Sequence, residues 1–354
     1  MAETDEIEFE EKGGTGFITL NRPKALNALT LGMIRAMIPQ LEAWRDDKNV
    51  KAVVITGAGD RAFCAGGDVR AVYEAGRNGG SLTKEFFRDE YRLNRMIHVF
   101  PKPYVALIDG ITMGGGVGLS VHGSHRVATE KTMLAMPETG IGLFPDVGGT
   151  YFLPRLPGRI GLFLALTGWR LDAADAVYCG LATDFVSSEG IPGLTDAFGT
   201  ADWAAGDAEA LVDQVIDEAK EAPGPSALAE FREVIDRCFA APSVEAILAA
   251  LDAEPGDWPA KIARIIRKQS PTSLKVTFAQ IEKGAALDFD SAMVEEYRLS
   301  QAFMAGADFY EGIRAVLVDK DHQPKWQPGD LSAVTPDMIE AHFSPLGDQD
   351  LTFA

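Results

Sequence analysis

Two carboxylates lie in unusually apolar surroundings near the middle of the chain. Glu138 and Asp146 are eight positions apart in the segment MPETGIGLFPDVGG, which also contains four glycines and the apolar residues Ile141 and Phe144. A carboxyl group beside such side chains loses hydration, which raises its pKa toward neutrality. Two acids in different environments can divide the roles of general base and general acid. The structural alternatives are a helix cap for Glu138 and a turn residue for Asp146.

Two glycine-rich loops each follow a predicted buried strand. The loop RAFCAGGDV, residues 61–69, comes after the strand KAVVIT, and the loop GITMGGGVGLS, residues 110–120, comes directly after the strand YVALID. Because glycine has no Cβ, such loops can turn backbone N–H groups toward a ligand. One N–H group from each loop could hold a carbonyl oxygen that becomes negative during a reaction, and losing one such donor typically costs ~2.7–4 kcal/mol. The alternative is that the glycines only form tight turns.

Two other motifs fit their patterns less well. GAGDRA, residues 57–62, matches the dinucleotide-binding pattern, but more loop sequence follows instead of a helix, and no acidic residue stands about twenty positions on. GLSVHG, residues 118–123, nearly matches the nucleophile elbow, but His122 takes the place of its second glycine. Neither a dinucleotide site nor a nucleophilic serine is therefore predicted.

The composition restricts the class of protein. The 354 residues are 46% hydrophobic and 24% charged, as in an ordinary globular protein, and no apolar run is long enough to predict a membrane span. The net charge of −19 disfavours nucleic-acid binding, and an anionic ligand would need a local basic patch. Three widely spaced cysteines and five scattered histidines give neither a disulfide framework nor a metal motif. Together with an acidic N-terminus that lacks targeting character, these features predict a reduced, cytoplasmic protein.

Alternating strand and helix signals in the first half of the chain predict an α/β core. Thr30 is placed to cap a helix over residues 31–47, which Pro39 should kink or break. The second part is Ala-rich, acidic and helix-prone. We therefore predict a core of residues 1–190 and a mainly helical region of residues 191–354, with no role beyond packing assigned to residues 187–260.

Several of these segments together resemble the crotonase, or enoyl-CoA hydratase/isomerase, superfamily. The matching segments are LNRPKALNALT, AFCAGGDV, ITMGGGVGLS and MPETGIGLFPDVGG, followed later by SPTSLKVTF, EEYRLSQAFM and DFYEGIRAVLVDKDHQPKW. The resemblance implies an α/β fold, a crotonase-like spiral of ββα units with a helical C-terminal part, and a coenzyme A thioester as substrate. It also implies an oxyanion hole formed by the backbone N–H groups of Gly67 and Gly115. The fold is then expected to bring these amides and Glu138 around one acyl carbon.

Within this superfamily, the acids favour hydrolysis over hydration. The resemblance implies that hydratases use two glutamates, one matched by Glu138 and the other falling at Gly118 in this chain. An acid stands instead at Asp146, and Glu90 in FRDEYRLN also matches the hydrolase branch. The resemblance implies hydrolysis of 3-hydroxyisobutyryl-CoA to 3-hydroxyisobutyrate and CoA in valine degradation, and 3-hydroxypropionyl-CoA, which differs by one methyl group, is expected as a second substrate. Glu138 would attack the thioester or activate water, and Asp146 would hold the 3-hydroxyl group or supply the proton to sulfur.

The resemblance also implies which residues bind the substrate. The residues expected at the acyl group are Glu90, Gly115, Glu138 and Asp146. The CoA phosphates need local cations, for which Arg22 and Lys24 are candidates, although both also fit as exposed loop charges. The residues expected to contact CoA are Arg22, Lys24, Ala25, Leu26, Ala28, Ala65, Asp68 and Val69.

The expected chemistry needs only polarisation of the thioester and proton transfer. We therefore expect no metal and no cofactor, since CoA is part of the substrate. An acyl-CoA is the expected partner, neither nucleic acid nor a membrane is expected, and a homo-oligomer is left open. Two alternative functions also stay open: an enoyl-CoA hydratase or isomerase acting on short acyl-CoA, and a non-catalytic acyl-CoA-binding protein.

Overall fold

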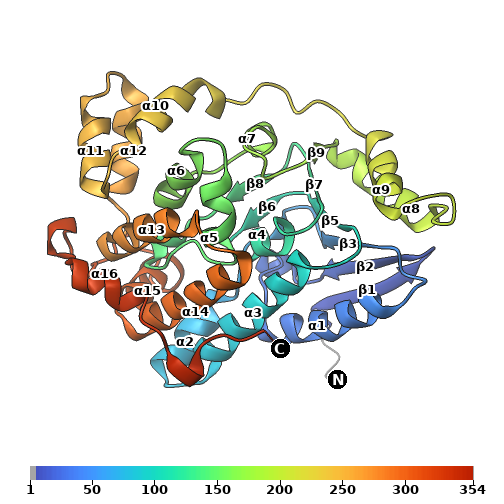
Figure 1. The fold of residues 1–354 in the computed structure, drawn as a ribbon, viewed down its shortest axis with the longest axis horizontal. Helices are drawn as coiled ribbons and strands as arrows, with labels where there is room; N and C mark the ends of the chain where they lie inside the picture. The colour runs from blue at the N-terminus through green and yellow to red at the C-terminus, as the bar shows by residue number, and fades with distance from the viewer. Residues whose placement is uncertain (1–4, 354) are drawn as a thin grey trace. The chain divides into compact units, whose positions relative to one another are not determined.

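The computed structural model describes residues 5–353 (Figure 1). These residues form two compact units that alternate along the sequence. Unit 1 comprises Met1–Gly67, Arg92–Leu134 and Arg170–Ala227. Unit 2 comprises Asp68–Tyr91, Ala135–Trp169 and Leu228–Ala354. Helix α3 (Leu82–His98) and strand β8 (Met133–Ala135) run across the unit boundaries. The division into residues 1–190 and 191–354 was drawn from sequence motifs and stays a prediction.

Unit 1 is built on a six-stranded sheet with the spatial order β1-β2-β3-β5-β7-β9. Its strands are β1 (Ile7–Lys12), β2 (Thr15–Leu20), β3 (Ala52–Gly57), β5 (Tyr104–Ile108), β7 (His125–Ala128) and β9 (Asp184–Phe185). Strands β1 and β2 form an antiparallel hairpin, and the other neighbouring pairs are parallel. The strands predicted at KAVVIT and YVALID are confirmed as β3 and β5.

A three-stranded sheet has the order β4-β6-β8. Its first two strands are β4 (Ala62–Cys64) and β6 (Ile111–Met113). Each of the successive pairs β3/β4, β5/β6 and β7/β8 therefore gives its first strand to the large sheet and its second to the small one. Helix α2 (Val69–Arg77) follows β4, and α4 (Gly115–Ser120) follows β6. This repetition places both glycine loops at the same point of the ββα unit, between a strand of the small sheet and a helix.

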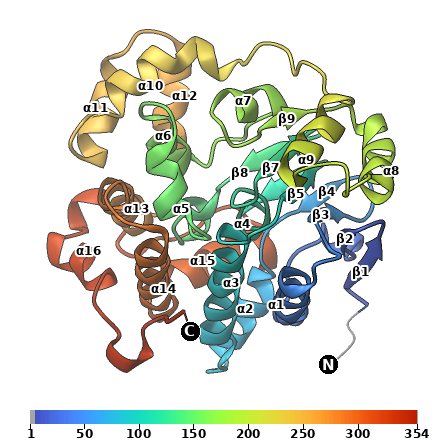
Figure 2. The same cartoon turned by 45° about the vertical axis from the view of Figure 1, so that its right-hand side comes forward.

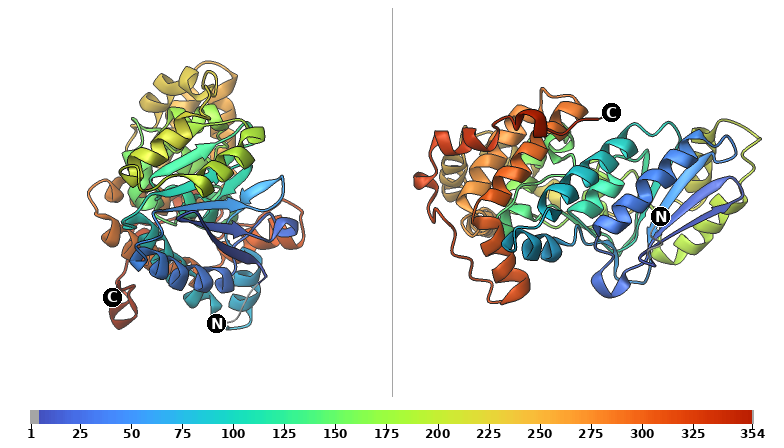
Figure 3. Two further views of the ribbon diagram at one scale, coloured as in Figure 1. Left: turned by 90° about the vertical axis from the view of Figure 1, so that its right-hand side faces the viewer. Right: turned by 90° about the horizontal axis from the view of Figure 1, so that it is seen from below.

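Helices cover both faces of the large sheet. Helices α8 (Ile191–Thr200) and α9 (Ala208–Asp217) pack on one face, where Phe198 and Val212 join the core formed by Phe17, Val54 and Val105. The left view of Figure 3 shows them on the side of the sheet opposite α1.

Helix α1 (Leu31–Asp46) is continuous, so the expected break at Pro39 does not occur. Thr30 caps it as predicted, because its hydroxyl accepts a hydrogen bond from the Met33 amide at 3.2 Å. The helix buries Met33, Ile34, Met37, Leu41 and Trp44. This apolar contact compensates for the one backbone hydrogen bond that an internal proline removes. The remaining helix of unit 1 is α7 (Ala173–Tyr178).

Unit 2 is mainly helical. Besides α2 and the first part of α3, its helices are α5 (Gly149–Phe152), α6 (Ile160–Thr167), α10 (Arg232–Cys238), α11 (Val244–Ala253), α12 (Asp257–Ile266), α13 (Pro271–Gly284), α14 (Phe289–Ala305), α15 (Asp308–Ile313) and α16 (Pro336–His342). Helices α13, α14 and α15 follow one another along the chain and agree with the predicted helix-prone character of its second part. Helix α16 lies beside α13 and α14 (Figure 2). No helix within residues 5–353 combines the length and the apolar character that crossing a bilayer requires.

Candidate functional site

Unit 2 contains a cluster of four buried carboxyl groups. Glu90 comes from α3, Glu138 begins the short helix η2 (Glu138–Ile141), Asp146 lies in the loop before α5, and Glu296 comes from α14. Their exposed fractions are 2%, 5%, 5% and 0%, respectively. The charge of Asp146 acts on each of the other three carboxyl groups. The structure thus brings together the three acids that the sequence singled out and adds Glu296.

The residues between Glu138 and Asp146 fix both acids in the core of unit 2. Gly142 ends η2 in the left-handed conformation, with φ 71°, and a Cβ there would overlap the Asp308 carbonyl group of α15. Phe144 is fully buried and stacks on Phe303 of α14, with ring centroids 5.5 Å apart. Packing of the residues between the two acids against α14 and α15 therefore keeps both carboxyl groups in the interior.

Burial raises the pKa of these carboxyl groups because it disfavours their charged form. Burial raises the pKa of Glu138 well above its ordinary value, and the charge of Asp146 raises it further. Burial also raises the pKa of Asp146 to about 7, although a hydrogen bond from the Tyr91 hydroxyl at 2.8 Å opposes this shift. Burial raises the pKa of Glu90 in the same way, and the charges of Asp146, Glu138 and Glu296 add to it. A carboxyl group that titrates near neutrality, as Asp146 does, can take up and release protons under physiological conditions.

Two oxygens of this cluster have no hydrogen-bond partner within residues 5–353. They are Oε1 of Glu90 and Oε2 of Glu138. A buried polar atom without a partner costs free energy, so such atoms are commonly found where a ligand or water completes the hydrogen bonds. These two oxygens are therefore candidates for contact with a bound molecule.

The predicted oxyanion donors lie in unit 1. Gly67 follows β4, and Gly115 is the first residue of α4, so its N–H group has no acceptor inside the helix. Within residues 5–353, neither of the two amides donates a hydrogen bond to another group of the protein. The loops are close together, because a Cβ on Gly66 would lie 3.7 Å from the Gly115 nitrogen. Unit 1 thus presents two unsatisfied N–H groups on neighbouring loops, as an oxyanion hole requires.

The close packing of α4 against β4 leads to a test of this loop arrangement. A Cβ on Gly116 would overlap the carbonyl group of Cys64. Gly116→Ala is therefore expected to displace α4 and to lower the free energy of unfolding by ~1–3 kcal/mol, the usual cost of overpacking. Urea unfolding would measure the loss. Gly193→Ala is the control, because no atom lies within 4 Å of the added Cβ; equal stabilities of the two variants would contradict the packing described.

The residues expected to contact CoA occupy two loops of unit 1 and the start of α2. Arg22 is engaged within the protein: its Nη1 donates to the Ala28 carbonyl group at 2.6 Å, and its Nε lies 2.9 Å from Glu6. Lys24 is exposed in the short helix η1 (Pro23–Ala25). The two loops are joined by backbone hydrogen bonds from Ala65 to Leu26 and from Leu29 to Gly66.

Asp68 and Val69 lie at the start of α2. Asp68 caps that helix, because its Oδ1 accepts from the Ala71 amide at 3.2 Å. Contact with CoA stays a prediction for all eight of these residues.

The sequence interpretation missed Asn27, Tyr91 and Glu296. Asn27 is fully buried with φ 54°, and its amide group donates to the carbonyl groups of Ala58 and Ala62. Glu296 was detectable, because it falls on the buried stripe of α14 that also includes Met293. A carboxylate at an apolar position of an amphipathic helix is a signal that the analysis of single motifs did not use.

The two rejected motifs are also rejected by the fold. GAGDRA runs from the end of β3 into β4, so a strand follows where a dinucleotide-binding motif needs a helix. Ser120 is buried inside α4, and its hydroxyl donates to the carbonyl groups of Gly116 and Val117.

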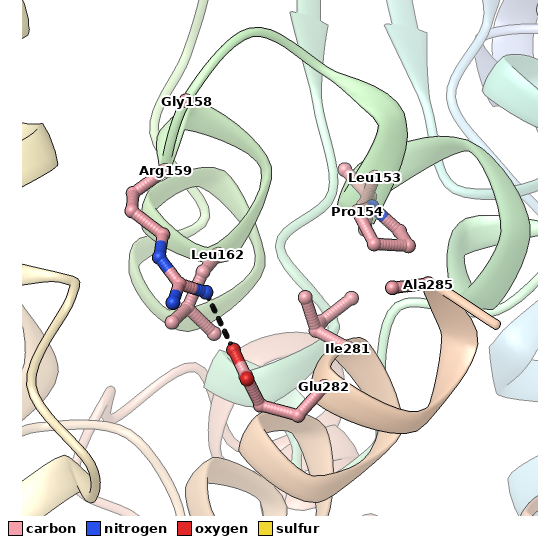
Figure 4. A pocket seen from close by; sticks show the side chains of 8 residues that line it. All are labelled: Leu153, Pro154, Gly158, Arg159, Leu162, Ile281, Glu282 and Ala285. Atoms are coloured by element: carbon pink, nitrogen blue, oxygen red, sulfur yellow. Dashed lines mark hydrogen bonds and ion pairs between the residues drawn. The ribbon is translucent and has the colours of Figure 1, made fainter.

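Two pockets in unit 2 have linings that do not include the carboxylate cluster. One has a volume of about 70 Å³ and lies between η3 (Leu153–Arg155), α6 and α13 (Figure 4). Figure 4 shows Arg159 and Glu282 paired across it, with Nη1 and Oε1 at 2.7 Å. The other has a volume of about 570 Å³, and its Arg314 is paired with Glu311. Neither lining includes an acid of the candidate site.

Comparisons with known proteins agree with this fold. The enoyl-CoA hydratase/isomerase family model matches residues 15–343. The mitochondrial 3-hydroxyisobutyryl-CoA hydrolase of Danio rerio is 55% identical over 348 residues, which cover 98% of this chain and 91% of that protein. The enzyme of the same name from Homo sapiens is 50% identical over 351 residues, covering 99% and 91%.

Solved structures show the same similarity. A carnitinyl-CoA dehydratase from Mycobacterium thermoresistibile has a TM-score of 0.92 and 43% identity, covering 99% of each chain. An enoyl-CoA hydratase from Rhodobacter sphaeroides 2.4.1 has a TM-score of 0.90 and 40% identity, covering 99% of this chain and 100% of that one. The predicted α/β fold with a crotonase-like spiral is therefore confirmed.

The predicted cellular location is wrong. The curated relatives are named as mitochondrial enzymes, which contradicts a cytoplasmic protein. The prediction rested in part on the cysteines, and Cys64, Cys179 and Cys238 are indeed buried and form no disulfide within residues 5–353. Free thiols indicate reducing conditions, however, and do not distinguish one reducing compartment from another.

One family accounts for three features of the chain: the ββα repetition, the segment at residues 136–149 with its two acids, and the match over residues 15–343. The chain belongs to the enoyl-CoA hydratase/isomerase family.

Proposed function

We propose that this chain hydrolyses the thioester of 3-hydroxyisobutyryl-CoA to 3-hydroxyisobutyrate and CoA. The observation that carries the proposal is the pairing of two buried acids, Glu138 and Asp146, whose pKa values are both raised. Position 118, where a hydratase would need its second glutamate, is a glycine buried in α4. Curated relatives with that hydrolase activity in their names are similar to the chain over nearly its whole length.

The proposed reaction begins with polarisation of the thioester. The amides of Gly67 and Gly115 donate hydrogen bonds to the carbonyl oxygen, which becomes negative when a nucleophile adds to the carbon. Glu138 either adds to the carbon itself, giving an anhydride, or removes a proton from an attacking water molecule. In both routes the C–S bond breaks, one water molecule is consumed, and the products are a carboxylic acid and a thiol.

Asp146 is proposed to act on the proton or on the hydroxyl group of the substrate. With a pKa of about 7 it is partly protonated at neutral pH, so it can supply a proton to the departing sulfur. It can also accept a hydrogen bond from the 3-hydroxyl group. Glu90, whose Oε1 has no partner within the described residues, is proposed to contact the same end of the acyl group.

The proposed place of the reaction is valine degradation, where 3-hydroxyisobutyryl-CoA is formed. A second substrate, 3-hydroxypropionyl-CoA, differs by one methyl group, which a pocket distinguishes by only ~1–3 kcal/mol. Both esters are therefore proposed as substrates. We propose that no cofactor takes part, because hydrolysis of a thioester requires no electron transfer.

A thiol-release assay over a panel of acyl-CoA esters tests the function. The expected result is rapid release of CoA from 3-hydroxyisobutyryl-CoA and slower release from esters without a 3-hydroxyl group. Hydration of crotonyl-CoA, measured by absorbance, is the comparison. Hydration without thiol release would assign the chain to the hydratases. CoA-ester binding with neither reaction would make it a binding protein, and either result would overturn the proposal.

Water labelled with ¹⁸O separates the two chemical routes. In a single turnover, label in the Glu138 carboxylate identifies the anhydride route in which water attacks the Glu138 carbonyl carbon of the anhydride in the second step. Direct attack by water places the label only in the product acid. Mass spectrometry of the peptide containing Glu138 distinguishes them.

Lys24→Glu tests the proposed contact with the CoA phosphates. Lys24 is exposed, so the substitution leaves the core intact, and reversal of one charge near a phosphate is expected to weaken CoA binding several-fold at low salt. The loss should shrink as the salt concentration rises, because salt screens exposed charges. Calorimetry of CoA binding measures it, and Lys320→Glu provides a control at another exposed lysine. Unchanged affinity at low salt would remove Lys24 from the site.

A further inference from the structure

The loop that carries Asp146 has an unusual backbone. Val147 has φ 49° and Gly148 has φ 92°, both in the left-handed region. This conformation is unfavourable for a β-branched residue such as valine, and it persists only where surrounding contacts enforce it. The question is therefore which side chains hold this loop in place.

Glu296 of α14 holds the loop with both of its carboxylate oxygens. Its Oε2 accepts a hydrogen bond from the Gly148 amide, and its Oε1 accepts one from the Thr150 amide, each at 2.8 Å. Glu296 is 0% exposed, so no solvent competes for these contacts. Because both partners are buried, leaving either of these hydrogen bonds unmade would cost free energy.

A second side chain holds the same loop from α13. The Nε2 atom of Gln280 donates to the Pro145 carbonyl group at 2.7 Å and to the Thr150 hydroxyl at 2.8 Å. Contacts are thus made before and after Asp146, whose own carboxylate accepts the hydrogen bond from Tyr91. The position of Asp146 is fixed by the side chains of three helices.

We propose that Glu296 is a positioning residue for Asp146 in thioester hydrolysis, an inference that rests on the proposed function. Glu296 acts through the Gly148 and Thr150 amides, which keep Val147 in its left-handed conformation and so set the direction of the Asp146 carboxyl group. A burial cost supports this assignment. Burial raises the pKa of Glu296 to about 8, and the charge of Asp146 adds to it, so a carboxyl group here is unfavourable unless its two hydrogen bonds are needed.

The experiment measures kcat and KM for thiol release in Glu296→Gln, Asp146→Asn and the double variant. Glutamine keeps the shape but has a single acceptor oxygen, so one of the two amides loses its partner. We expect kcat to fall between about tenfold and a hundredfold with little change in KM, as for a misplaced catalytic group. Because Glu296 is proposed to act through Asp146, the double variant should have almost the same kcat as Asp146→Asn alone.

Glu295→Gln is the matched control. It makes the same chemical change at the neighbouring position of α14, where the Glu295 Oε1 has no hydrogen-bond partner within residues 5–353. Its kcat should equal that of the wild type. If Glu296→Gln and Glu295→Gln behave alike, or if the losses multiply in the double variant, Glu296 has only a structural role and the inference is overturned.

Hydrogen exchange provides a readout that does not depend on turnover. The Gly148 and Thr150 amides should be protected in the wild type and in Glu295→Gln, and should exchange faster in Glu296→Gln. A wild-type protein that releases no thiol would refute the proposed function. Hydrogen exchange would then still show whether Glu296 keeps the Gly148 and Thr150 amides protected. Unchanged exchange in Glu296→Gln would refute that hold even in an active enzyme.

Discussion

Glu138→Gln is expected to reduce kcat for thiol release by ~10²–10⁴-fold, the usual contribution of a general base or of a nucleophile of this kind. Glutamine has nearly the same shape, so the anchoring contacts of Gly142 and Phe144 with α15 and α14 should be preserved. It cannot, however, take a proton from water or add to a thioester carbon. The loss should therefore appear mainly in kcat, with binding of CoA esters little changed.

Folding measurements separate this catalytic loss from damage to the protein. The burial of Glu138 raises its pKa because the interior disfavours the charged form, so a neutral side chain of the same shape should not destabilise the protein. Glu340→Gln, at an exposed position of α16, is the control for the substitution itself. Near-normal turnover in Glu138→Gln would exclude Glu138 as base and as nucleophile.

Asp146→Asn is expected to lower kcat by ~10²-fold or more while it stabilises the protein at alkaline pH. The folded-state pKa of about 7 lies above the ordinary value of 3.8. Stability from the neutral carboxyl group is therefore fully present below about pH 4 and is lost as the pH rises to 7, because the unfolded chain ionises first. Asparagine does not ionise, and its carbonyl oxygen can still accept the hydrogen bond from Tyr91.

The measurement is urea unfolding of the wild type and Asp146→Asn at several pH values. Between pH 4 and pH 7, the free energy of unfolding of the variant should rise relative to that of the wild type. The pKa difference sets the total change at roughly a few kcal/mol. Above pH 7 the difference should be constant. A difference in stability that does not change with pH would show that Asp146 is not a buried neutral acid. A variant with normal kcat would remove Asp146 from the mechanism.

The sequence predicted the parts of the site that depend on short segments. Glu138 and Asp146 stood out because charged residues are rare among Ile141, Leu143 and Phe144, and burial of both acids follows from that setting. Strands β3 and β5 were recognisable from their continuous apolar character, whereas the short strands β4 and β6 fall inside the segments that were predicted as glycine loops. Gly118 separated hydrolysis from hydration once the resemblance was recognised. The division at residue 190 and the eight CoA contacts stay predictions.

The parts that were missed depend on residues far apart in the chain. Glu296 lies 148 positions from Gly148 and Tyr91 lies 55 positions from Asp146, so no local pattern relates either pair. The continuity of α1 across Pro39 was likewise decided by the contact of its buried face with the sheet, which outweighs the local preference of proline.

The sequence by itself therefore determined the types of chemistry available, namely two acids in apolar surroundings and two glycine loops after buried strands. The family resemblance added the expectation of ββα units. The tertiary structure decided the pKa values of the acids and their positions. Their pKa values depend on burial and on one another's charge, and the Asp146 loop depends on hydrogen bonds from α3, α13 and α14. Both effects act through space over a few ångströms, and only folding brings residues 90, 146, 280 and 296 within that range.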